Sequence, residues 1–167
     1  MAEVKSSGEM REFSTGAHRD SNSAIQKGRT DVLPLDVVAR VLDNEAIKEL
    51  WEFVRTFDTD HVIKAIRIIG KSEPKWDNAL GIAMWDASFQ YEDGGNKYGF
   101  GNWTYGMPVE VLLDSAVRHY LKHLGGMTDE PHHRAVMWNL LNLVWTMEHV
   151  PNAKEDFMRF VADIWHN

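Results

Sequence analysis

Apolar residues recur every three to four positions along most of the chain beyond its N-terminal part, which is the spacing of an amphipathic α-helix. This spacing predicts helices over 37–54, with a break near Asp43–Asn44, and over His61–Ile69, where Asp60 is the expected cap. It predicts a further helix over Trp76–Asp93. Three helical stretches are therefore expected between Pro34 and Asp93, with a linker at 71–75.

A loop is expected from Gly94 to Trp103, because its first eight residues include four glycines and glycine destabilises a helix interior. Three more helices are expected after Pro108, Pro131 and Pro151, since proline suits the first helical position. Gly125–Gly126 would end the first of them. We find no convincing strand pattern, so the predicted fold is an all-α helical bundle.

The N-terminal part differs from the rest of the chain. Residues 1–34 are rich in Ser, Gly, Lys, Arg and Glu and show no apolar period, which indicates an extended arm or a disordered tail. We therefore divide the chain into an arm over 1–34, which would contribute to the functional site, and a single helical-bundle domain over 35–167.

Composition narrows the classes of function. The net charge of −7 disfavours direct nucleic-acid binding but allows a small anionic substrate at a local basic cluster. The absence of cysteine excludes disulfides, thiolate catalysis and zinc–thiolate sites. No apolar run reaches transmembrane length and the N-terminus lacks an apolar signal core, so we expect no membrane association and a cytoplasmic location.

Polar residues interrupt the apolar pattern of the helix expected after Pro131. His132, Asn139, Asn142 and Thr146 recur at helical spacing, and Asn139 stands inside an otherwise apolar run. A buried asparagine is costly unless it is hydrogen-bonded. The pattern therefore indicates either one hydrogen bond to a neighbouring helix or a polar site inside the bundle.

Carboxylates and histidines near helix ends are the candidate metal ligands. Asp129, Glu130 and His132 surround the start of one helix and are ligand types for divalent cations, but acidic residues also cap helix N-termini. Glu92 closes another helix, where a carboxylate opposes the helix dipole. A metal site would tolerate that position, although an exposed surface glutamate explains it equally simply.

Three further groups of residues could bind a nucleotide. In the glycine-rich segment a lysine can meet a phosphate and aromatic rings can stack on a base, or these rings cover the core. Charged residues in the arm could clamp a polyphosphate or be solvated. In the third group, which follows Pro108, Asp114 and Arg118 stand four positions apart, and this spacing is typical of an ion-paired surface. The residues are Lys97, Tyr98, Asn102 and Trp103; Arg19, Lys27, Arg29 and Asp31; and Asp114, Arg118 and His119.

Six sequence elements follow one another along the chain. They are TGAHRD at 15–20, KGRTDVLP at 27–34, YE with KYGFGNW within 91–103, DSAVRH at 114–119, DEPH at 129–132 and WNLL at 138–141. Together they resemble the phage and prophage dATP/dGTP diphosphohydrolase family, and the resemblance extends over about residues 13–150. The chain would then be a phage protein acting in the host cytoplasm or a bacterial prophage protein.

The resemblance implies an activity and a set of residues. The family is related to the MazG-like all-α nucleotide pyrophosphohydrolases, which are homodimers or larger homo-oligomers. It implies hydrolysis of dATP or dGTP to the monophosphate and pyrophosphate with two or three Mg²⁺ or Mn²⁺ ions. The implied catalytic carboxylates and metal ligands are Glu92, Asp114 and Glu130, with His132 or Asp129 completing the metal site. The implied substrate contacts are Arg19, Lys27, Arg29, Asp31, Lys97, Tyr98, Asn102, Trp103, Arg118, His119 and Asn139.

Two departures from the related families keep other functions open. The E-x-x-E and E-x-x-D signature of the MazG-like enzymes is not legible, and Ala135 stands where some relatives carry a second histidine. One alternative is a pyrophosphatase for another nucleotide, such as dUTP or a modified nucleotide. The other is a non-enzymatic phage protein that binds a nucleotide or a partner.

Overall fold

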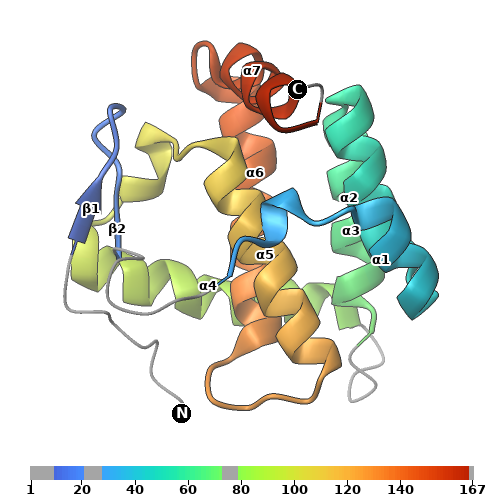
Figure 1. Ribbon diagram of the computed structural model, residues 1–167. Helices are drawn as coiled ribbons and strands as arrows, with labels where there is room; N and C mark the ends of the chain where they lie inside the picture. The colour runs from blue at the N-terminus through green and yellow to red at the C-terminus, as the bar shows by residue number, and fades with distance from the viewer. Residues whose placement is uncertain (1–9, 21–27, 73–78, 166–167) are drawn as a thin grey trace.

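Seven α-helices account for most of the residues that the computed structural model describes, which are 10–20, 28–72 and 79–165 (Figure 1). The helices are α1 (Leu35–Leu42), α2 (Glu45–Thr56), α3 (Thr59–Gly70), α4 (Ala79–Tyr98), α5 (Val109–Leu124), α6 (His132–His149) and α7 (Ala153–Trp165). Two 3₁₀ helices, η1 (Thr30–Val32) and η2 (Asn102–Tyr105), and two strands, β1 (Met10–Glu12) and β2 (His18–Asp20), complete them. The predicted all-α helical bundle is confirmed.

The central element is the pair α5 and α6, which pack against each other more extensively than any other two elements (Figure 1). In this view α1 to α3 lie on one side of the pair, and the β1–β2 hairpin lies on the other. The core is built from fully buried apolar side chains of α2, α5, α6 and α7, and the rings of Phe53 and Phe157 stack with centroids 5.3 Å apart. No helix among the described residues is long and apolar enough to cross a membrane.

The predicted break between the first two helices is confirmed at Asp43–Asn44. Asp43 adopts a left-handed conformation with φ 48°, and the Asn44 side chain accepts a hydrogen bond from the backbone N–H of Ile47 at 3.0 Å. The cap of the next helix differs from the prediction. Asp58, rather than Asp60, caps α3, because its carboxylate accepts a hydrogen bond from the backbone N–H of Asp60.

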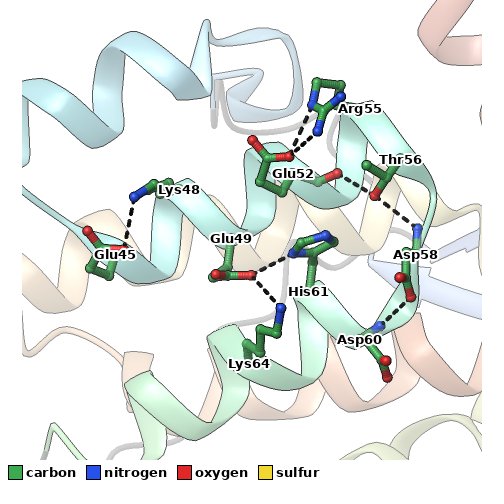
Figure 2. A network of polar contacts seen from close by, with 10 residues as sticks. All are labelled: Glu45, Lys48, Glu49, Glu52, Arg55, Thr56, Asp58, Asp60, His61 and Lys64. Atoms are coloured by element: carbon green, nitrogen blue, oxygen red, sulfur yellow. Dashed lines mark hydrogen bonds and ion pairs between the residues drawn. The ribbon is translucent and has the colours of Figure 1, made fainter.

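Ion pairs fasten α2 to α3 on their solvent side (Figure 2). The Glu49 carboxylate lies 2.6 Å from Nδ1 of His61 and 3.9 Å from Nζ of Lys64. Within α2, Arg55 contacts Glu52 at 2.6 Å. The residues are partly or largely solvated, so each pair adds little to the stability of the fold. This network lies on helices that do not line the cavity described below.

The predicted glycine-rich loop is wrong in its first half. Helix α4 continues through Gly94 and Gly95 and ends at Tyr98. At Gly95 the ring of Phe100 lies close to the backbone, and an added Cβ would meet it at 2.5 Å. The chain leaves the helix at Gly99, whose φ of +94° favours glycine. Glycine therefore serves close packing at one position and chain reversal at the other.

The expectation that the chain lacks strands is also wrong. β1 and β2 form an antiparallel hairpin in which Arg11 pairs with Arg19 and Glu12 with His18. The turn between them is closed by a hydrogen bond from the Phe13 N–H to the Ala17 carbonyl at 2.9 Å. Only three residues of each strand pair, which is too short for an alternating pattern to be recognised.

Candidate functional site

A cavity of about 390 Å³ opens between β2, α4, η2, α5 and α6. Its volume falls within the range of roughly 300–1,000 Å³ that is typical of small-molecule sites. Nine residues proposed from the sequence line it: Arg19, Glu92, Tyr98, Asn102, Trp103, Arg118, His119, Glu130 and Asn139. Side chains from opposite ends of the sequence therefore meet in one cavity.

Three metal-ligating side chains cluster at this cavity. His119 of α5, His132 of α6 and Glu130 just before α6 place one donor atom each within 4.8 Å of the others. Nδ1 of His119 lies 2.9 Å from Nδ1 of His132 and 3.8 Å from Oε2 of Glu130. His132 is buried, whereas Glu130 and His119 are half-buried and line the cavity. Two imidazoles and a carboxylate in this arrangement fit a divalent cation.

The electrostatics of His119 suit a ligand role. Burial, together with the charges of Arg118 and His132, lowers the pKa of His119 from its ordinary value of 6.5 to about 3. The imidazole is therefore neutral at physiological pH, because its folded-state pKa lies far below 7. A neutral ring keeps a nitrogen lone pair for a cation and needs no deprotonation before binding.

Asp129 contacts the far side of His132 and does not line the cavity. Its Oδ1 lies 2.9 Å from Nε2 of His132, and its Oδ2 lies 3.7 Å from Nζ of Lys122. A carboxylate at Nε2 favours the tautomer that carries its proton there. The Asp129 contact therefore leaves Nδ1 of His132 with its lone pair facing His119 and Glu130.

Two guanidinium groups converge on Ser115 beside this cluster. Nη2 of Arg19 donates to Ser115 Oγ at 2.6 Å and to Asn139 Oδ1 at 3.0 Å, and Nη2 of Arg118 donates to the same hydroxyl at 3.1 Å. Asn139 is buried, and its own amide donates to the carbonyl of Ala135 at 2.7 Å. Two guanidiniums held this closely form a binding place for phosphate oxygens.

Asp114 lies behind this pair rather than in the cavity. Its carboxylate is ion-paired with Arg118 and accepts hydrogen bonds from the backbone N–H of Thr30 at 2.7 Å and from the Thr30 hydroxyl at 3.0 Å. It is 5% exposed and does not line the cavity. In this arrangement the carboxylate orients Arg118 and attaches η1 to α5.

Among the described residues, the others proposed from the arm and from α4 do not line the cavity. Arg29 forms an ion pair with the buried Asp31 at 2.6 Å, and this contact raises the pKa of the guanidinium. Lys97 lies over the ring of Tyr98, with Nζ 5.0 Å from the centroid. Lys27 lies outside the described residues.

Aromatic rings form a further part of the cavity lining. Tyr91 contacts Trp103 and Trp138 edge-on or tilted, with centroids 5.6 and 5.9 Å apart, and all three line the cavity. Burial raises the pKa of Tyr91 to about 12, so its hydroxyl stays protonated. The guanidinium of Arg19 lies 5.8 Å from the Trp138 ring and connects these rings to the charged side.

Sequence reasoning did not assign Ser115, Tyr91 or Trp138 to the site. Ser115 could have been found, because it stands three and four positions before Arg118 and His119 and therefore shares their helix face. The two aromatic residues gave no such signal, because rings at helical spacing usually fill a core.

The side chain of Asn102 connects the β1–β2 hairpin to η2, beside the cavity. Its Oδ1 accepts from the His18 N–H at 2.8 Å, and its Nδ2 donates to the His18 carbonyl at 3.0 Å. Thr15 adds a hydrogen bond from its hydroxyl to the Gly106 carbonyl at 2.6 Å. Because His18 directly precedes Arg19, the amide of Asn102 fixes the backbone from which Arg19 reaches Ser115.

Replacing Asn102 by alanine is expected to lower kcat/KM for nucleotide hydrolysis by about 10- to 30-fold, since two hydrogen bonds of about 1 kcal/mol each are lost. N102D, which keeps the acceptor but not the donor, should give a smaller loss. Steady-state kinetics of N102A, R19A and the double variant test the link. The double variant should be little worse than R19A, and additive losses would show that Asn102 does not act through Arg19.

Comparison with protein-family models gives a match to the chain. The family model described as dATP/dGTP diphosphohydrolase, N-terminal, matches residues 65–156, which is more than half of the sequence. No curated protein and no solved structure gives a significant match. The matched segment carries α4, η2, α5 and α6, the elements that supply the cavity with all its lining residues except those of the hairpin. The chain therefore belongs to the dATP/dGTP diphosphohydrolase family.

Proposed function

We propose that the chain hydrolyses dATP or dGTP to the deoxynucleoside monophosphate and pyrophosphate in this cavity, with the help of divalent cations. The observation that carries the proposal is the meeting of two guanidiniums and a metal-ligating cluster in one cavity of nucleotide size. Membership of the diphosphohydrolase family supports the reaction class and the purine substrate.

The charged side of the cavity would bind the triphosphate. Arg19 and Arg118 compensate phosphate charge and hold the chain of phosphates in one orientation, because guanidiniums can bind phosphate oxygens in pairs. Asp114 keeps the Arg118 guanidinium in place, and Asn139 does the same for Arg19. Tyr91, which is also at the cavity, belongs to the aromatic part of the lining, which would lie against the base.

Mg²⁺ or Mn²⁺, when bound, would activate a water molecule and offset charge on the leaving pyrophosphate. His119, Glu130 and His132 would hold one such ion. Glu92 lines the cavity from α4 and would supply the carboxylate for a second ion. The water oxygen forms a bond to the α-phosphorus, the bond from that phosphorus to the α,β-bridging oxygen breaks, and the water proton passes to solvent.

The test is pyrophosphate release from all common dNTPs and rNTPs with Mg²⁺ and with Mn²⁺. We expect dATP and dGTP to be the best substrates, and E92Q to lose at least about 10-fold in kcat/KM because a metal-bound carboxylate is removed. D93N, which changes the neighbouring exposed carboxylate that does not line the cavity, is the control. Preference for dUTP or another nucleotide, or binding without pyrophosphate release, would contradict the proposal, and full activity of E92Q would exclude the second ion.

A further inference from the structure

The donor atoms of the cluster differ from those expected of a magnesium site. Mg²⁺ prefers oxygen ligands in octahedral geometry and is usually held by carboxylates, phosphates and water. Here two of the three clustered donors are imidazole nitrogens, from His119 and His132, and only Glu130 supplies oxygen. Imidazole suits first-row transition metals, whose affinities for nitrogen ligands exceed that of magnesium.

The separations within the cluster are also compatible with one shared ion. The two Nδ1 atoms lie 2.9 Å apart. Two nitrogens that each lie about 2.1 Å from a common metal and form an angle of about 90° at it are separated by about 3 Å. The two rings are therefore already spaced as neighbouring ligands, and Glu130 at 3.8 Å from His119 needs only a small side-chain movement to join them.

The surroundings of His132 determine which nitrogen of its ring is available to a metal ion. Its Nε2 is occupied by Asp129 at 2.9 Å, and its side chain is 1% exposed, so the ring cannot turn freely to water. A carboxylate behind a ligating histidine fixes the tautomer and raises the basicity of the ligand.

We propose that His119, Glu130 and His132 form a binding site for one transition-metal dication, which they bind in preference to Mg²⁺, and that Asp129 acts as the positioning residue for His132. This inference rests on the proposed function only for the role of the ion, since the ion would bind in the same cavity. The site exists in the free protein, so binding does not require a nucleotide.

The experiment uses the full chain, stripped of metal with a chelator and titrated with Mn²⁺ in the absence of nucleotide. Electron paramagnetic resonance of the free Mn²⁺ gives the bound fraction. We expect one tight ion per chain, and Mg²⁺ in about 100-fold excess should displace less than half of it. Co²⁺ should give a visible absorption spectrum that differs from that of aqueous Co²⁺.

Variants separate ligands from neighbours. H119A and H132A should weaken Mn²⁺ binding by about 100-fold or more, and D129N by about 10- to 100-fold. H123A is the matched control, because His123 lies one turn further along α5, pairs with His133 at 5.2 Å between ring centroids, and is not part of the cluster. The Mn²⁺ affinity of H123A should equal that of the wild type. Circular dichroism confirms folding, and D129N tests the proposal even if loss of the buried His132 perturbs the core.

The outcomes distinguish this inference from the proposed function. Displacement of Mn²⁺ by an equal concentration of Mg²⁺, or unchanged Mn²⁺ affinity in H119A and D129N, overturns the transition-metal site. Tight Mn²⁺ binding without pyrophosphate release from any nucleotide supports the site and contradicts the proposed function. Hydrolysis that proceeds with Mg²⁺ while Mn²⁺ fails to bind the cluster supports the proposed function and contradicts the transition-metal site.

Discussion

Replacing Arg19 by alanine is expected to lower kcat/KM for dGTP hydrolysis by about 10²–10³-fold, the usual cost of removing one donor from a developing phosphate charge. Arg19 reaches the cavity from the hairpin and donates to Ser115 and Asn139. The free energy of unfolding should fall by only about 1 kcal/mol, because one buried acceptor loses its partner. Pyrophosphate release and chemical denaturation measure the two effects.

Two variants sharpen the Arg19 test. R11A removes an arginine from the neighbouring strand, where Arg11 is exposed and lies over Phe13, and it should keep wild-type kinetics. R19K keeps the charge but loses the planar fork of donors, so it should recover only part of the activity. Activity of R19A within about threefold of the wild type would remove Arg19 from the site, since one good hydrogen bond to a charged group exceeds that effect.

The helices were predictable because each buries one apolar stripe. The residues of α2, α5 and α6 that are fully buried, such as Leu50, Leu113 and Leu140, are those that repeat every three or four positions. The extension of α4 through Gly94 was not predictable, since the local preference of glycine opposes it. Only the position of the Phe100 ring, which depends on the tertiary fold, explains the close approach at Gly95.

The site was predictable as a set of residues but not as a set of contacts. Sequence motifs identified both Asp114 and His119, yet they could not show which of the two faces the cavity. In the structure the Asp114 carboxylate accepts a hydrogen bond from Thr30, which is far away in the sequence. His119 instead belongs to the cluster of possible metal ligands. A one-dimensional pattern contains no information on such long-range pairing, because carboxylates and imidazoles suit ion pairs and metal sites equally well.

Asn102 shows the same limit for the arm. An amide in a segment rich in aromatic residues suggested contact with a nucleoside, whereas its side chain bonds the backbone of His18. Backbone partners leave no trace in a sequence, since every residue carries the same N–H and carbonyl groups. The arm was recognisable only from its sequence motif. The motif identified Arg19 as a candidate but could not show where its side chain lies.

Replacing Glu130 by glutamine is expected to lower kcat/KM by at least about 10²-fold, because loss of a direct metal ligand should exceed the 10- to 100-fold cost of losing a residue behind one. Glu130 supplies the only carboxylate of the cluster, and its oxygen lies 3.8 Å from Nδ1 of His119. A neutral amide oxygen keeps the shape of the side chain but attracts a cation far less. The loss should therefore appear mainly as a shift of the activity curve to higher metal concentrations.

The measurement is pyrophosphate release by E130Q over a range of Mn²⁺ concentrations, compared with the wild type and with E110Q. Glu110 is a suitable control, because burial raises its pKa and it does not line the cavity, so a neutral glutamine replaces it at little cost. Partial recovery of E130Q at high Mn²⁺ would assign Glu130 to metal binding, whereas equal loss at every Mn²⁺ concentration would place it in the chemical step instead. Wild-type activity of E130Q at low Mn²⁺ would contradict both roles.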